Sequence, residues 1–200
     1  MKLKSTVIAA AIGSLFTVSA NAAVPVFVDN FDSHAPLQLN WAPPAPSGWT
    51  VTDGTVDLIG PGLFDLLPGN GHYIDLDGST SNSGLFSNSV NLTGGITYTL
   101  SFDLAGSQRG TSETVNVIFG SENASFSLNS ADPFSTYSMN FTPGASGSYN
   151  FSYQNLGGDN VGILLDNVSV SPVPEPETYA MLLAGLGLLG FAARRRRENA

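Results

Sequence analysis

The sequence predicts an all-β fold, an antiparallel β-sandwich of the jelly-roll type, flanked by two short terminal segments of different character. Three observations predict it. Apolar and polar residues alternate with a period of two along many short stretches, as they do in strands with one buried face. Clusters of Gly, Pro, Asn and Asp separate these stretches, and no convincing amphipathic helix interrupts them. The 22 glycines, 12 prolines and 12 phenylalanines of the 200 residues combine helix breakers with large apolar side chains for a core, which argues against a disordered chain.

The central part of the chain, residues 23–172, supplies about eleven strand candidates. In the clearest of them, residues 96–104, five apolar side chains point one way and the intervening Thr, Ser and Asp side chains point the other. The candidates are 24–28, 49–52, 55–59, 72–76, 84–90, 96–104, 115–119, 124–128, 136–141, 148–153 and 162–170. This number of short antiparallel strands in one domain is typical of a jelly roll.

One long connection, residues 33–48, interrupts the regular spacing. It contains four prolines and is too long for a hairpin turn, so we expect it to lie across one end of the sandwich, where loops frequently contact ligands. Trp41 lies in this loop, where core burial explains an aromatic ring least easily. Because the C–H face of a pyranose packs on an aromatic ring, Trp41 is the favoured residue of a sugar-stacking platform. The other candidates are Trp49, Phe64 and Tyr73, and the alternative for each ring is core filling.

Residues 1–22 have the pattern of a secretory signal peptide. Lys2 and Lys4 give a positively charged start, and an apolar stretch too short to span a bilayer follows. Ala20 and Ala22 are small residues at the two positions that signal peptidase recognises. The alternative, an amphipathic first helix, fails because the stretch has no polar face. We therefore expect cleavage after Ala22 and a mature chain that leaves the cytoplasm.

Residues 173–200 form a second terminal segment with three parts. It begins with Val173, Pro174, Glu175 and Pro176, and it ends in an arginine cluster, Arg194, Arg195, Arg196 and Arg197. The prolines exclude a helix at its start. Residues 178–193 carry no charge. As a helix they would be about 24 Å long, and the hydrocarbon layer of a membrane is about 30 Å thick. Such a helix just spans the membrane when the arginine side chains extend to its surface. By the positive-inside rule the arginines stay in the cytoplasm and the acidic domain lies outside.

The order of these parts resembles the PEP-CTERM sorting tail of exported proteins, over residues 173–197. The resemblance implies recognition by an exosortase, a transpeptidase-like membrane enzyme that cuts near the Pro174–Pro176 motif and releases or re-anchors the protein. It also implies a Gram-negative host that makes exopolysaccharide. The catalytic residues of that reaction belong to the exosortase. The alternative is a permanent membrane anchor of the same orientation.

The charge of the central part excludes several function classes. Residues 23–172 hold thirteen acidic residues and a single basic one, Arg109, a net charge of −12. Such a surface repels phosphate, so nucleic-acid binding is excluded. The chain has no cysteine, which excludes disulfides, thiolate metal sites and cysteine nucleophiles. Arg109 lies in a loop, where pairing with an acidic neighbour is favoured over contact with a ligand.

No acid/base constellation for catalysis stands out. Asp75 and Asp77 lie on one face of an extended strand, but a catalytic pair needs one protonated and one ionised carboxyl. Solvated aspartates at a strand end are favoured instead. His34 and His72 are the only histidines, and neither belongs to a Gly-x-Ser-x-Gly elbow or to a set of three zinc ligands, so we expect both on the surface. A glycosidase or lyase is therefore disfavoured.

Four segments are similar to galactose-binding-like jelly rolls: 29–32, 73–78, 94–102 and 164–170. Relatives include exported bacterial anchor proteins and plant cell-wall domains, many of unknown function. The resemblance implies the jelly-roll fold. It implies carbohydrate binding less specifically, because proteins with this fold have many different functions. It also implies a structural calcium ion between the loop after the first strand and the last strand, with Asp32 and Asp166 as ligands and Asn30 as a lesser candidate. The alternative is that Asp166 accepts hydrogen bonds from backbone amides in a turn or bulge.

Together these features indicate a non-catalytic protein exported to the surface or exopolysaccharide matrix of a Gram-negative bacterium. Its processing partners are signal peptidase and an exosortase in the inner membrane, and it binds a polysaccharide through loops that include Trp41. The rival is a structural matrix or adhesion protein without a discrete ligand, whose acidic, hydroxyl-rich surface supplies hydration and cation bridging.

Overall fold

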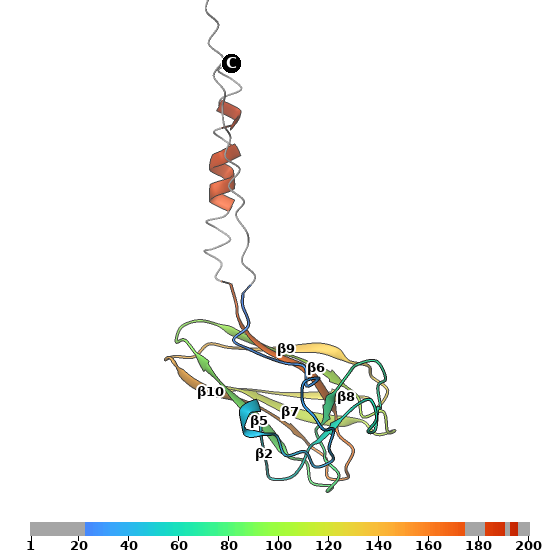
Figure 1. Ribbon diagram of the computed structural model, residues 1–200. Coiled ribbons are helices and arrows are strands. Elements are labelled where there is room, and N and C mark those ends of the chain that lie inside the picture. The colour runs from blue at the N-terminus through green and yellow to red at the C-terminus, as the bar shows by residue number, and fades with distance from the viewer. Residues whose placement is uncertain (1–22, 175–182, 191–192, 196–200) are drawn as a thin grey trace, which may run out of the picture. The chain divides into compact units, whose positions relative to one another are not determined.

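Two antiparallel sheets packed face to face make up the central domain (Figure 1), which confirms the expected β-sandwich. The computed structural model describes residues 23–174, 183–190 and 193–195. All of its strands lie within Ala23–Val173, which forms one compact unit. They are β1 (Phe27–Asp29), β2 (Thr50–Thr52), β3 (Asp57–Ile59), β4 (Tyr73–Asp75), β5 (Leu85–Leu92), β6 (Tyr98–Ala105), β7 (Glu113–Phe119), β8 (Glu122–Leu128), β9 (Ser135–Phe141), β10 (Gly147–Asn155) and β11 (Leu164–Pro172), with a short 3-10 helix, η1 (Ala45–Ser47), before β2.

The strand pairing places β11 in the middle of the first sheet. This sheet has the order β3-β4-β11-β6-β9, with β1 added beside β11. Along one edge of β11, Leu164 and Leu165 pair with β4, and Val168–Val170 pairs with β1. The other edge pairs with β6, with a bulge between Asp166 and Ser169. The second sheet has the order β2-β5-β10-β7-β8.

The main hydrophobic core lies between the sheets, and the period-two alternation builds it. In β6, for example, Leu100, Phe102 and Leu104 are fully buried in this core. A second, smaller cluster lies on the outer face of the first sheet, because its members alternate along the strands with residues of the main core. It comprises Ile59, Tyr73, Ala105 and Leu164, with the half-buried Leu39, Leu66, Leu67 and Phe134 packed against it. Ala23–Val173 thus has its own core and contains what it needs to fold as a separate fragment.

The proline-rich loop, residues 33–48, lies along the side of the sandwich and not across its end as expected. Gln38 exchanges two backbone hydrogen bonds with Leu58 of β3, at 3.0 and 2.9 Å. The loop then reaches the second sheet, where the Asn88 side chain of β5 donates to the carbonyl oxygen of Ser47 at 3.3 Å. The loop is therefore part of the wall that closes the gap between the edges of the two sheets.

The terminal segments are described only in part. Residues 183–190 and 193–195 are helical, and no helix among the described residues is long and apolar enough to cross a membrane. Several expectations fall outside the described residues and stay predictions. They concern the signal peptide over 1–22 with Ala20 and Ala22, the ends of the membrane helix expected over 178–193, and Glu175, Pro176, Arg196 and Arg197.

Candidate functional site

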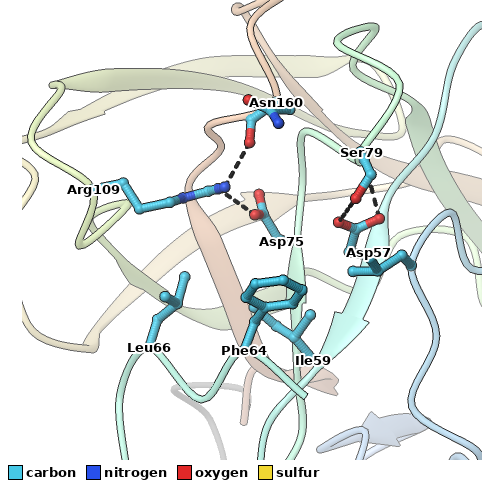
Figure 2. Close-up of a pocket in the computed structure, with 9 residues that line it drawn as sticks. Asp57, Ile59, Phe64, Leu66, Asp75, Ser79, Arg109 and Asn160 are labelled. Atoms are coloured by element: carbon cyan, nitrogen blue, oxygen red, sulfur yellow. Dashed lines mark hydrogen bonds and ion pairs between the residues drawn. The ribbon is translucent and has the colours of Figure 1, made fainter.

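A pocket of about 160 Å³ opens on the outer face of the first sheet, at β3 and β4 (Figure 2). Leu58 and Ile74 of these strands point into the main core. Their neighbours in sequence therefore point to the opposite face and line the pocket: Asp57, Ile59 and Asp75. Loops supply the rest of the lining: Leu39, Phe64, Leu66, Ser79, Arg109 and Asn160. The pocket thus combines apolar side chains with one cation, two carboxylates and a hydroxyl.

Two aspartates face each other across the floor of this pocket. Asp57 and Asp75 are directly opposite in the β3–β4 pair and are only 5% and 2% exposed. Like charges in this position repel. Asp57 is compensated by hydrogen bonds, since its carboxylate accepts from the Asn40 amide at 2.6 Å and from the Ser79 hydroxyl at 2.8 Å. Asp75 is compensated by an ion pair with Arg109.

Arg109 uses both ends of its guanidinium group. Nη2 donates to Oδ2 of Asp75, and Nη1 donates to the backbone carbonyl oxygen of Asn160 at 2.6 Å (Figure 2). The predicted pairing of Arg109 with an acidic neighbour is therefore confirmed. Burial raises the pKa of Asp75 to about 7, against the opposing effect of the Arg109 charge. This carboxyl therefore takes up a proton at a higher pH than an exposed aspartate does.

Phe64 places an exposed aromatic ring at the pocket. It is 62% exposed, and its φ of 49° lies in the left-handed region that a bulky residue rarely adopts. The loop that carries it is anchored to the sheet. The Leu67 amide donates to the Tyr73 hydroxyl at 2.9 Å, and that hydroxyl donates to Oδ1 of Asp65 at 3.2 Å. The fold thus holds an aromatic face beside buried polar groups.

Trp41, the favoured sugar-stacking residue, lies in the core. It is 5% exposed and packs in the main hydrophobic cluster. The expectation that this ring escapes the core is wrong, because its amide donates to the Val56 carbonyl oxygen at 2.7 Å and holds the loop against the edge of the sheet. Trp49 and Tyr73 are 2% and 0% exposed. Of the four candidate rings, Phe64 is by far the most exposed. Trp41 and Trp49 also line an open hollow of about 520 Å³ beside the proline-rich loop, and a ligand role for Trp41 stays a prediction.

The remaining candidates are also more buried than expected. Asp75 and Asp77 are 2% and 0% exposed, so the expectation of solvated aspartates at a strand end is wrong. His34 and His72 are half-buried, because both rings tie the loop after β1 to its neighbours. Nε2 of His34 lies 2.8 Å from Oδ2 of Asp29, and Nδ1 of His72 lies 3.1 Å from the His34 carbonyl oxygen. Both histidines are therefore only partly exposed, where the sequence placed them on the surface.

The two predicted calcium ligands, Asp32 and Asp166, come close together but have protein partners. Asp32 accepts hydrogen bonds from the His72 amide at 2.8 Å and from the Asn30 side chain at 2.9 Å. Asp166 accepts from the Asn167 amide at 2.7 Å, beside the bulge, which is the alternative that the sequence left open. Burial and the charges of nearby aspartates, Asp32 among them, raise the pKa of Asp166 to about 7. No three His, Asp or Glu side chains in the described part of the chain are arranged to hold a metal ion, so calcium stays a prediction.

Sequence reasoning misses three polar residues of the pocket: Asp57, Ser79 and Asn160. Asp57 is the one charged residue within the strand candidate 55–59, and a charge inside an apolar run is a signal for a buried group with a partner. Ser79 and Asn160 reach the pocket from loops, and no local pattern gives the course of those loops.

Comparisons with known families and structures agree with this architecture. The profile described as protein of unknown function (DUF642) matches residues 30–171, and the PEP-CTERM protein-sorting motif matches residues 172–197. No curated protein matches the sequence. Among solved structures, the chain is similar to the CBM22-1 xylan-binding domain of Xyn10C from Paenibacillus barcinonensis, with 13% identity, a TM-score of 0.55, and coverage of 78% of this chain and 99% of that one. It is also similar to the CBM22-1-CBM22-2 tandem domain of the same protein, with 14% identity, a TM-score of 0.54, and coverage of 79% and 48%.

These likenesses confirm the jelly-roll fold and the resemblance of the tail to a PEP-CTERM segment. The sorting motif indicates an exported protein that is processed at a membrane. The match over residues 30–171 spans every residue that lines the pocket. The chain belongs to the DUF642 family of proteins of unknown function.

Proposed function

We propose that the domain is a non-catalytic glycan-binding module and that sugar binds at the pocket beside Phe64. The observation that carries the proposal is an exposed aromatic ring held in a strained backbone conformation next to buried polar groups. Strain of this kind persists where the surrounding structure imposes it, and it clusters at binding sites. The xylan-binding domain with a similar fold supports the same class of ligand.

Each part of a sugar has a counterpart in the pocket. The apolar face of a pyranose stacks on Phe64. Sugar hydroxyls accept hydrogen bonds from Arg109 and donate to Asp75. The cavity of about 160 Å³ is smaller than the roughly 300–1,000 Å³ of common ligand pockets, so it suits one sugar residue at a chain end or branch.

The carboxylates of the pocket suit binding and not hydrolysis. Asp57 accepts three hydrogen bonds, two of them from Ser79, and Asp75 is paired with Arg109. A glycosidase needs one carboxyl to protonate the leaving group and a second to attack or to activate water. Both aspartates are held by their own partners on one strand pair, and this arrangement supports a non-catalytic role.

The terminal segments give the module its location. Signal peptidase removes residues 1–22, and an exosortase acts near the Pro174–Pro176 motif, which delivers the domain to the surface or exopolysaccharide matrix of a Gram-negative cell. Mass spectrometry of protein from its native host tests this route. The expected mature chain starts at Ala23 and ends near the motif, and an intact full-length chain in the cytosol would contradict the route.

A second candidate function, a structural matrix protein without a discrete ligand, also has an observation in its favour. The outer face of the second sheet carries facing pairs of uncharged hydroxyl and amide side chains: Thr114–Ser127, Asn116–Ser125, Ser152–Ser87 and Asn150–Ser89. Such a face binds water and offers no charge to a specific partner. The two functions predict different outcomes with isolated glycans.

A glycan array probed with fragment 23–174 tests the binding proposal. We expect selective binding of a few glycans and a loss of about tenfold in affinity for Phe64→Ala, because the stacking surface is removed. The matched control is Ile118→Ala, which removes an exposed apolar side chain from the outer face of the second sheet. Equal losses of affinity in both variants contradict binding at the pocket. If the wild type binds no glycan on the array, the matrix function is favoured. Turnover of a polysaccharide contradicts the non-catalytic role.

A further inference from the structure

Three polar side chains lie between the sheets at the place where the apolar core ends. Glu113 begins β7 on the same face as the core residue Val115, and Asn155 ends β10 on the same face as Tyr153. Asp77 follows β4 by two residues. Glu113, Asn155 and Asp77 are 9%, 2% and 0% exposed. We call these three residues the buried acidic cluster.

Asp77 has no partner for its charge. Neither carboxylate oxygen accepts a hydrogen bond from any described residue. The nearby Ser83 hydroxyl donates instead to the carbonyl oxygen of Gly157 at 3.4 Å. The Glu113 carboxylate makes no hydrogen bond or ion pair among the described residues either. Arg109, the one arginine of the domain, is already bound in the pocket.

Two buried carboxylates of the same sign are therefore close together without a cation. Burial raises the pKa of Asp77, and the charges of Asp159 and Glu113 raise it further. The Ser83 hydroxyl and the Asp159 amide offset this rise only in part, since neither donates a well-formed hydrogen bond to the carboxylate. A buried charge is stable only when it is paired or neutralised, so the cluster requires a proton or a cation from solution.

A glycine keeps the space between these side chains open. A Cβ atom at Gly157 would lie 2.9 Å from Oδ2 of Asp77, 3.4 Å from Oε2 of Glu113 and 2.8 Å from Nδ2 of Asn155. The backbone at Gly157 does not adopt a positive φ, so its conformation does not demand glycine. The absence of a side chain instead leaves room beside both carboxylates.

We propose that the buried acidic cluster binds a divalent cation, Ca²⁺ by its donor chemistry, between Asp77 and Glu113. Calcium prefers carboxylate, carbonyl and water oxygens and takes about six to eight of them. Two carboxylates are not enough, so water molecules and backbone carbonyl oxygens have to complete the set.

The ion has a structural consequence for the sugar pocket. It joins the end of β4 to the start of β7, beside Gly157 of the loop over residues 156–162. The same loop contains Asn160, whose carbonyl oxygen holds Arg109 in the pocket. The site is separate from the one predicted at Asp32 and Asp166, and it does not depend on glycan binding.

Thermal unfolding of chelator-treated fragment 23–174, with and without CaCl₂, tests the proposal. We expect the midpoint to rise by about 5–10 °C at a calcium concentration a hundred times the dissociation constant. Asp77→Asn and Glu113→Gln remove this rise, and Asp32→Asn, which disables the other predicted calcium site, keeps it. Isothermal titration calorimetry of the same proteins counts the sites directly. Glu113→Gln keeps the test usable if Asp77→Asn does not fold.

Two outcomes overturn the proposal. If the wild type shows no rise and no heat of binding, the cluster holds a proton instead of an ion. If the rise survives in Asp77→Asn and Glu113→Gln but is lost in Asp32→Asn, the ion lies at the other site.

Discussion

The pocket beside Phe64 and the buried acidic cluster each bring two carboxylates together, and they differ in what neutralises them. In the pocket, Asp75 is paired with Arg109 and the facing Asp57 is fully hydrogen-bonded. In the cluster, two residues further along the chain, Asp77 meets Glu113 with no positive partner. The domain has thirteen acidic residues and one arginine. The comparison teaches that the position of this arginine decides which buried carboxylates the protein satisfies and which need something from solution.

Removing the arginine has the largest expected effect on stability. Arg109→Met leaves Asp75 buried without a partner and lowers the free energy of unfolding by about 3 kcal/mol at pH 8. Arg109→Lys keeps the positive charge but not the planar, forked set of hydrogen-bond donors, so it lowers the free energy of unfolding less than Arg109→Met does. Urea denaturation measures both. Equal stability of Arg109→Met and wild type would mean that this ion pair does not hold the pocket.

A change of pH has the next largest effect on the free energy of unfolding, which should be larger at the lower pH. Burial raises the pKa of Asp75 and of Asp166 from 3.8 to about 7. A carboxyl whose pKa is higher in the folded state adds stability that is complete below about pH 3.8 and is lost as the pH rises through about 7. In chelator, the free energy of unfolding should therefore be about 2 kcal/mol larger at pH 6 than at pH 8. Asp75→Asn should remove about half of this dependence, because Asp166 still titrates, and greater stability of the wild type at pH 8 than at pH 6 would refute the prediction.

Two isosteric substitutions, two residues apart, should have opposite signs in chelator. Asp75→Asn breaks the ion pair with Arg109 and costs about 1–2 kcal/mol. Asp77→Asn removes an unpaired buried charge and gains about 1 kcal/mol. Urea denaturation in the presence of EDTA compares them. If both destabilise to the same extent, the contrast between the pocket and the cluster fails.

Phe64 should give the smallest change in stability. Because the side chain is 62% exposed, Phe64→Ala alters the free energy of unfolding by less than about 0.5 kcal/mol. Phe64→Gly relieves the strain of a positive φ and gains about 0.5 kcal/mol. Calorimetry measures both changes, and glycan affinity should fall in both variants. A large loss of stability in Phe64→Ala would assign the ring a structural role instead.

The parts of the molecule that sequence predicts well are those that local patterns determine. The alternation over residues 96–104 predicts a strand, and β6 spans Tyr98–Ala105. The order of the tail segments predicts the PEP-CTERM motif found over residues 172–197. The sequence also predicts that the partner of Arg109 is acidic, because a single arginine among many acidic residues pairs with one of them.

The site depends on contacts between distant segments, which no local pattern contains. Trp41 is misjudged because its burial follows from a hydrogen bond to Val56 and from the course of a whole loop. Asp77 is misjudged because Glu113 and Asn155 come from two other strands of the opposite sheet. Phe64 appears among the candidate rings in the sequence, but only the fold shows that it is the exposed one.

The sorting tail leaves the domain from β11, and this has a mechanical consequence. β11 is hydrogen-bonded to β6 on one side and to β4 and β1 on the other, and Val173, just beyond its end, still donates to the Thr97 carbonyl oxygen at 2.8 Å. Antiparallel hydrogen bonds run perpendicular to the strands, so a pull along the tail loads them in shear and all at once. If the C-terminus is tethered, its tension is thus shared by the three neighbouring strands.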